Sequence, residues 1–104
     1  MKLPGNMNMN QMMQQAQQLQ NKMRQEIAAV RVETSAGGGM VTLKMDGEKN
    51  LLAVKIDPEV AGDVEMLQDM VLAAHSEAIK RVEEETKRIA SGMLGGMGLP
   101  PGLF

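Results

Sequence analysis

The residues of this chain that could do chemistry are its lysines and arginines. Phosphate binding requires clustered cations rather than a positive total, because neighbouring cations together displace condensed counterions. The 104-residue chain has a formal charge of −2, yet its first 31 residues carry a single acid, Glu26. Residues 57–69, by contrast, contain five acids and no base. The candidates for phosphate contact are Lys22, Arg24, Arg31, Lys80, Arg81, Lys87 and Arg88.

The same cations have an alternative explanation as a solvated surface, since charged helix faces commonly serve solubility. Glu83–Lys87 and Glu84–Arg88 have the i,i+4 spacing of intrahelical ion pairs. The many glutamines between residues 11 and 25 leave a similar choice. Amide side chains can bind phosphates or base edges, but glutamine is also a good uncharged helix former.

Catalytic and metal-binding arrangements are not recognisable in the sequence. His75 is the only histidine, cysteine is absent, and no serine has a marked base partner. The side chains of Glu83–Glu85 fan around a helix, and Gly37–Gly39 lacks the Lys-Ser/Thr of a phosphate loop. We therefore expect no enzymatic function, cofactor, metal site or small-molecule substrate.

Two long helices and three short strands must position the cations. From Asn8 to Val30 the apolar residues advance by threes and fours, which predicts a helix with Asn8 or Asn10 as its N-cap. Alternating apolar and polar residues predict strands over residues 30–35, 41–45 and 52–56. Turns at Gly37–Gly39 and Asp46-Gly47 make these strands an antiparallel meander.

A second long helix is predicted after the sheet. Asp57-Pro58-Glu59 ends the third strand, Asp63 is the expected N-cap and Gly92 the expected end. The fold class is therefore α+β, with a long helix, a three-stranded antiparallel meander and a long helix. Residues 8–92 form one dimerising domain between a flexible N-terminal arm (1–7) and a flexible Gly/Pro-rich tail (93–104).

The cellular location follows by elimination. No apolar run approaches the ~20 residues of a membrane span, and the start of the chain lacks the apolar region of a signal peptide. We expect a cytoplasmic protein without a membrane partner.

Several segments in register resemble the YbaB/EbfC family of bacterial nucleoid-associated proteins. The resemblance covers nearly the whole chain and begins with the Met/Gln-rich first helix. The other segments are Ala36-Gly37-Gly38-Gly39-Met40-Val41, Val54-Lys55-Ile56-Asp57-Pro58-Glu59, Met66-Leu67-Gln68-Asp69 and Gly95-Gly96-Met97-Gly98-Leu99-Pro100. This resemblance implies a tweezer-shaped homodimer with protruding helices that binds double-stranded DNA with low sequence specificity. The uncharged first part of helix 1 departs from the basic surface expected of such a helix.

Dimerisation is also expected from the size of the sheet, because three short strands cannot cover two long helices. We expect the two-fold contact within residues 40–56, and the candidate interface residues are Met40, Val41, Leu43, Ala53 and Val54. A rival hypothesis uses the adaptable thioethers of Met9, Met12, Met13 and Met23 as a groove for a partner helix. The protein would then be an interaction module for a replication or recombination protein, with weak or no DNA binding.

Overall fold

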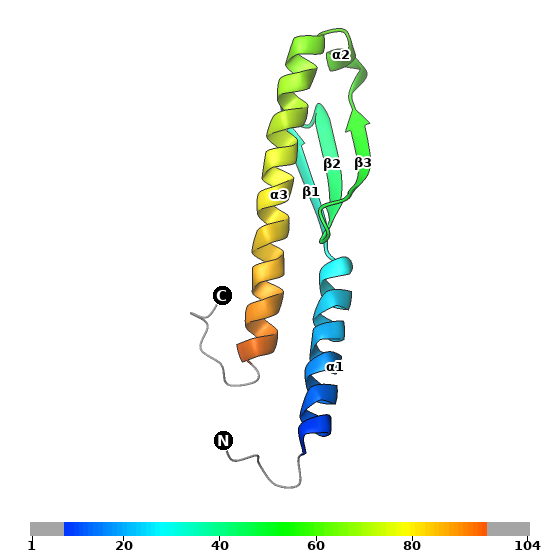
Figure 1. Cartoon of the computed structure of the whole chain (residues 1–104). Coiled ribbons are helices and arrows are strands. Elements are labelled where there is room, and N and C mark those ends of the chain that lie inside the picture. Colours follow the sequence, from blue (N-terminus) through cyan, green and yellow to red (C-terminus); the bar gives the residue numbers. More distant parts are fainter. Residues whose placement is uncertain (1–7, 96–104) are drawn as a thin grey trace.

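The structure is a computed structural model that describes residues 8–95 (Figure 1). Its elements are α1 (Met9–Ala28), β1 (Arg31–Ala36), β2 (Val41–Asp46), β3 (Leu51–Ile56), α2 (Pro58–Ala61) and α3 (Val64–Gly95). The predicted α+β fold, with a meander between two long helices, is confirmed. The predicted N-terminal arm and most of the predicted tail lie outside the described residues.

The molecule is elongated, with extents of 67 × 23 × 15 Å, and α3 runs along much of its length (Figure 1). The first half of α3 lies against the sheet, and its second half lies beside α1. We call the sheet, α2 and residues 64–82 the body. We call α1 and residues 83–95 the stem. The stem projects from the body as one pair of helices.

The three strands pair antiparallel in the order β1-β2-β3. Between β1 and β2, Gly37, Gly38 and Gly39 have φ values of 64°, 68° and 95°, which confirms the predicted glycine turn. Alternate side chains of β1 and β2 face α3 and are buried, as predicted. The core residues are Val32, Val41, Leu43, Met45, Val60, Ala74, Ala78 and Val82. Thr34 is buried among them because its hydroxyl donates to the carbonyl of Ala74 at 2.8 Å.

The third strand differs from the half-buried strand that its sequence predicts. All its residues are exposed, although Val54 and Ile56 pair with Leu43 and Val41 on the α3 side of the sheet. The physical reason is that a single helix is too narrow to cover three strands: α3 packs against β1 and β2 and leaves β3 uncovered. The apolar inner side of β3 is therefore open in the single chain.

Helix α1 begins with a capping box. The Asn8 side chain accepts a hydrogen bond from the Gln11 amide at 2.8 Å, and the Gln11 side chain accepts one from the Asn8 amide at 3.3 Å. At the other end, Gly47 packs under Ile27. A Cβ at Gly47 would overlap the Ile27 carbonyl oxygen, so only glycine fits at this junction.

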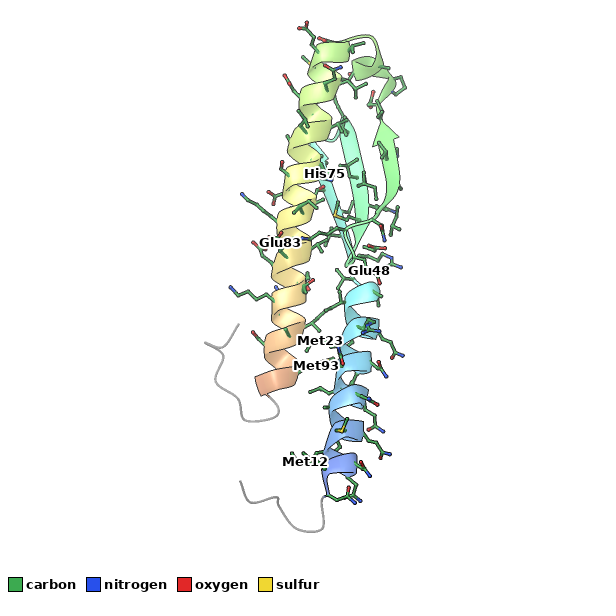
Figure 2. The ribbon with its side chains drawn as sticks, in the orientation of Figure 1. Met12, Met23, Glu48, His75, Glu83 and Met93 are labelled. Atoms are coloured by element: carbon green, nitrogen blue, oxygen red, sulfur yellow. The ribbon has the colours of Figure 1, made fainter. Side chains whose placement is uncertain are left out.

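The start of α3 was predicted correctly and its end was not. Asp63 accepts a hydrogen bond from the Met66 amide at 3.1 Å, as an N-cap does. The short helix α2, capped by Asp57, was not predicted. Gly92 lies inside α3, which continues to Gly95. Half-buried Met93, beside α1 (Figure 2), offsets the helix penalty of about 1 kcal/mol that glycine carries.

Candidate nucleic-acid interface

The predicted phosphate-binding residues lie on three elements and are all exposed. Lys22 and Arg24 are on α1, Arg31 begins β1, and the other four are on α3. Because α1 lies beside the second half of α3, the fold gathers cations from distant parts of the sequence around the stem (Figure 1).

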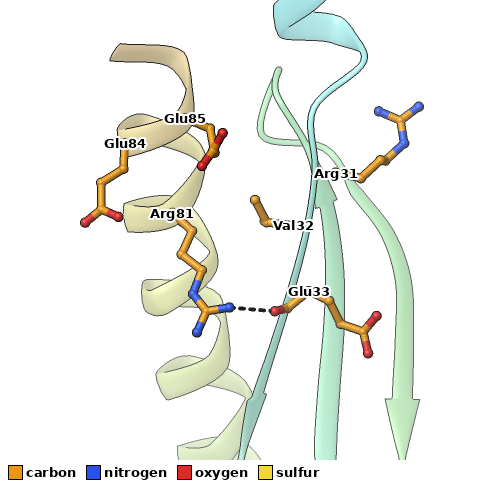
Figure 3. A pocket seen from close by; sticks show the side chains of 6 residues that line it. All are labelled: Arg31, Val32, Glu33, Arg81, Glu84 and Glu85. Carbon is orange, nitrogen blue, oxygen red and sulfur yellow. Dashed lines mark hydrogen bonds between the residues drawn. The ribbon is translucent and has the colours of Figure 1, made fainter. Parts of the chain in front are cut away.

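Three of the predicted arginines, Arg31, Arg81 and Arg88, already bind other groups of the chain. Nη1 of Arg31 donates to the carbonyls of Ala28 and Val30, each at 2.8 Å, and so fixes the link between α1 and β1. Nη1 of Arg81 donates to the Glu33 carbonyl at 2.9 Å (Figure 3), and its Nε lies 3.4 Å from Glu77. Arg88 pairs with Glu85 at 3.1 Å.

Four cations of the predicted set have neither an ion pair nor a side-chain hydrogen bond within residues 8–95: Lys22, Arg24, Lys80 and Lys87. The i,i+4 pairs expected from the sequence, Glu83–Lys87 and Glu84–Arg88, are not the ones observed there. Glu83 instead bonds Lys49 of the β2–β3 turn at 3.2 Å (Figure 2 labels Glu83). Because Glu83 bonds Lys49, it does not form the expected ion pair with Lys87. Spacing along the sequence could not reveal this tertiary contact.

The carboxylate of Asp46 stabilises the β2–β3 turn through hydrogen bonds to the backbone. Asp46 accepts hydrogen bonds from the backbone amides of Glu48 and Asn50, each at 2.9 Å. The Asn50 backbone hydrogen bond is the main cause that lowers the pKa of Asp46 below its usual 3.8, with a smaller contribution from the charge of Arg31. The turn that carries Gly47 and Lys49 is therefore well defined beside the stem.

Hollows near these cations are lined by both signs of charge. One of about 330 Å³ is lined by Arg31, Val32, Glu33, Arg81, Glu84 and Glu85 (Figure 3). Another of about 330 Å³ lies among Lys80, Glu83, Glu84 and Lys87 on α3. His75 is exposed on α3 and lines neither. In the described part of the chain, no group of three or more His, Cys, Asp or Glu residues could hold a metal ion.

The predicted dimer residues fall into different environments. Val41 and Leu43 are fully buried under α3, so they belong to the protomer core and offer no surface to a partner. Met40 is half-buried, Val54 is 52% exposed, and Ala53 is exposed opposite Lys44.

The exposed apolar surface of β3 includes Val54, which was among the predicted interface residues, and three residues that were not: Leu51, Leu52 and Ile56. It comprises Leu51, Leu52, Val54 and Ile56 of β3, and we call it the β3 surface; each of these residues is between 41% and 52% exposed. Val64, Met66 and Leu72 of α3 are also exposed apolar residues. The number of predicted strands could have indicated this exposure, because one helix cannot cover all three strands of the sheet.

The chain matches the YbaB/EbfC DNA-binding family over residues 5–97. It is 51% identical to a nucleoid-associated protein of Koribacter versatilis, covering 92% of this chain and 97% of the relative. It is 43% identical to one of Clostridium novyi, covering 96% and 91%. A crystal structure of an uncharacterized protein from Helicobacter pylori superposes with a TM-score of 0.72 at 26% identity, covering 86% of this chain and 99% of that one.

The two curated relatives are named nucleoid-associated proteins, and the matching family is a DNA-binding family, not an enzyme family. Within the described residues, neither long helix has an apolar stretch sufficient to cross a membrane. The fold, the cations of the stem and the match over residues 5–97 agree, and the chain belongs to the YbaB/EbfC DNA-binding family.

Proposed function

We propose that this protein binds double-stranded DNA as a homodimer with low sequence specificity, and that the stem supplies the principal phosphate contacts. The observation that carries the proposal is a set of four exposed cations on two adjacent helices that have no ion pair within the described residues. Lys22, Arg24 and Lys87 lie on the stem, and Lys80 lies at the adjoining end of the body. Membership of a nucleoid-associated family supports DNA as the ligand and the bacterial cytoplasm, at the nucleoid, as the location.

The overall acidity of the chain is compatible with DNA binding because its charges are segregated. The acids of residues 57–69 are exposed on α2 and the first part of α3, at the end of the body away from α1 (Figure 1). This acidic end repels a duplex, whereas the cations around the stem attract it. Unequal charge at the two ends of a 67 Å molecule orients the stem toward DNA before contact.

Low specificity follows from the residue types on the stem. Lysine and arginine contacts to phosphates position a protein on the duplex without reading its sequence. Glutamines on α1, including Gln14, Gln17 and Gln18, are exposed and could add hydrogen bonds without charge. No helix-turn-helix signature is present to direct a recognition helix into the major groove.

The β3 surface supports the homodimer. Its exposed apolar side chains lie on an edge strand, whose unpaired backbone groups also invite a partner strand. Val54 and Ile56 face the same side as the core, so a second copy could extend that core across β3. We therefore place the dimer contact at Leu51, Val54 and Ile56. Half-buried Met40 lies nearby in the β1–β2 turn, where its carbonyl accepts a hydrogen bond from the Asp57 amide that follows β3.

A direct test is a gel shift of the purified protein on unrelated duplexes of equal length at low and high salt. We expect similar affinities on all sequences, and a steep loss as salt rises because counterions are released on binding. Binding to only one sequence would point instead to base readout by the glutamine-rich face. No binding at low salt would overturn the proposal.

The interaction-module hypothesis is favoured by one observation, the exposure of thioethers on α1. Met9 is 75% exposed and Met13 is 59% exposed, which suits an adaptable contact with a partner helix. A replication or recombination protein retained after nuclease treatment, and lost in a Met9→Gln/Met13→Gln variant, would support this second function. If nuclease treatment abolishes retention of the partner protein, the two proteins were linked only through DNA.

A further inference from the structure

The face of the sheet away from α3 carries cations that neither the core nor the stem uses. Val32, Leu43 and Met45 point toward α3 and are buried, so the alternate residues lie on the opposite, outer face. Figure 3 shows this for β1, where the Arg31 and Glu33 side chains extend away from α3 and Val32 points toward it. The outer face comprises Arg31, Glu33, Ser35, Thr42, Lys44, Asp46, Ala53 and Lys55.

The register places these residues in cross-strand rows. Ser35, Thr42 and Lys55 form one row across the three strands, and Glu33, Lys44 and Ala53 form the next. Diagonal neighbours in a sheet are about 7–8 Å apart, so the Lys55 and Lys44 side chains leave the sheet close together. Hydroxyls and ammonium groups are both donors to phosphate oxygens.

Cations outnumber acids on this face by one. Glu33 lies 4.0 Å from Lys44, at the limit of an ion pair, and their side chains are 61% and 59% exposed; such a pair contributes little. Asp46 lies opposite Arg31 in the register, and its carboxylate, held by the amides of the β2–β3 turn, keeps its negative charge. The face therefore carries three cations, Arg31, Lys44 and Lys55, against the two acids Glu33 and Asp46.

The outer face also has a hollow of a size that admits an anion. A hollow of about 390 Å³ is lined by Arg31, Val32, Glu33, Lys44 and Leu52. Only Nη1 of Arg31 donates to backbone carbonyls. Its Nη2 and Nε make no bond within residues 8–95, so a guanidinium with free donors lines the hollow.

Protection of the sheet edge accounts for only one of the two lysines on this face. A lysine on an edge strand such as β3 discourages pairing with another sheet, which would explain Lys55. Lys44, however, lies on β2, the central strand, whose two neighbours are already paired. The only aromatic residue in the chain is Phe104, so this face has no platform on which single-stranded bases could stack.

From these observations we infer that the outer face of the sheet is a second DNA-contact surface, which binds duplex phosphates through Lys44, Lys55 and Arg31 with help from Ser35 and Thr42. This inference rests on the proposed function and adds a surface in the body to that of the stem. In a homodimer the surface is present twice, so one dimer can hold a longer path of backbone than the stems alone.

The test measures duplex affinity against salt for two opposed variants. Lys44→Glu/Lys55→Glu should weaken binding and reduce the magnitude of the slope of log affinity against log salt by up to about 3.6 in a dimer, at about 0.9 per phosphate contact. Glu33→Lys should strengthen binding and steepen the slope by up to about 1.8. Glu33 is suitable because its recorded bond to Arg81 uses the backbone carbonyl, which the substitution keeps.

Each outcome is decisive. Unchanged affinity and slope in both variants, with wild-type binding intact, would overturn the second surface while leaving the stem proposal in place. If the wild-type protein bound no duplex, the proposed function and this inference would fail together. Circular dichroism and sedimentation mass show whether each variant keeps its fold and assembly. If the Lys44→Glu/Lys55→Glu variant unfolds, the milder Lys44→Gln/Lys55→Gln variant and the gain expected from Glu33→Lys still show whether the outer face binds duplex DNA.

Discussion

The body and the stem hold their apolar residues in different ways. In the body, α3 brings Ala74, Ala78 and Val82 against the strands, and side chains such as Leu43 and Met45 are fully buried. In the stem, no residue of α1 is buried, and Met12, Leu19, Met23 and Ile27 are only half-buried (Figure 2 labels Met12 and Met23). The folding free energy is therefore concentrated in the body.

This difference explains why the stem is suited to binding. A helix whose stability does not depend on a buried core can carry many exposed polar side chains at little cost to folding. Regions with few buried apolar contacts also open locally at lower free energy than the core. The stem can thus adapt to a ligand while the body keeps its structure.

The largest effect should come from emptying the core of the body. Leu43→Ala removes a fully buried side chain and should lower the free energy of unfolding by about 2–5 kcal/mol. The matched change in the stem, Leu19→Ala, removes a half-buried leucine and should cost about 1 kcal/mol. Denaturant unfolding at fixed protein concentration measures both. Equal costs would show that the stem contributes a core of its own.

The next effect concerns the junction between the two regions. Gly47→Ala brings a methyl group against the Ile27 carbonyl and should cost about 1–3 kcal/mol through overpacking. It should also speed amide hydrogen exchange in α1 more than in β1 or β2. Gly62→Ala is the control, because nothing lies within 4 Å of that added Cβ, and it should stay within about 0.5 kcal/mol of wild type. Slow exchange in α1 of Gly47→Ala would contradict this account of the junction.

A substitution at Val54 tests the exposed β3 surface separately from the buried core of the protomer. Leu43 is buried within the protomer, whereas Val54, its partner in the register, is 52% exposed. Val54→Asp should weaken the dimer at least tenfold, or about 1.4 kcal/mol, and leave the helical content of the monomer intact. Sedimentation across a dilution series measures the mass. A dimer that survives in Val54→Asp would place the contact elsewhere.

The smallest effect is a pH dependence of the β2–β3 turn. Because the pKa of Asp46 is lowered below 3.8 by its hydrogen bonds, the carboxylate stabilises the fold above that pH and loses this contribution as pH falls through the folded pKa. Wild type should therefore exceed Asp46→Ala in thermal midpoint near neutral pH, and the gap should narrow in more acidic solution. Glu48→Ala, in the same turn, is the control. A gap that is independent of pH would refute the role of the charge.

Much of the body was predictable from sequence, because burial there follows local periodicity. The α3 stripe from Leu67 to Val82 and the inward residues of β1 and β2 are where the spacing placed them. The openness of β3 was not predictable in the same way, since it depends on how many strands α3 spans. The end of α3 was also missed, because packing of the stem outweighs the local signal of Gly92.

The candidate site was less predictable than the fold. Sequence indicated which residues are cations, but not which of them have partners. Arg31 and Arg81 are tied to backbone carbonyls, and Glu83 is drawn from its own helix to Lys49. Such contacts join residues far apart in the chain, so spacing along one helix cannot reveal them.

The most direct test of the central claim is the salt dependence of duplex affinity for Lys22→Glu/Arg24→Glu. Both residues are exposed on α1, so the variant should keep its helicity and dimer mass. Its matched control is Glu59→Lys/Glu65→Lys, which changes as many charges at the acidic end of the body. We expect a weaker affinity for the stem variant on every duplex. The slope of log affinity against log salt should be reduced in magnitude by up to about 3.6, the equivalent of four phosphate contacts per dimer. The control should keep the wild-type slope. An unchanged affinity and slope in the stem variant would remove α1 from the DNA interface and contradict the account.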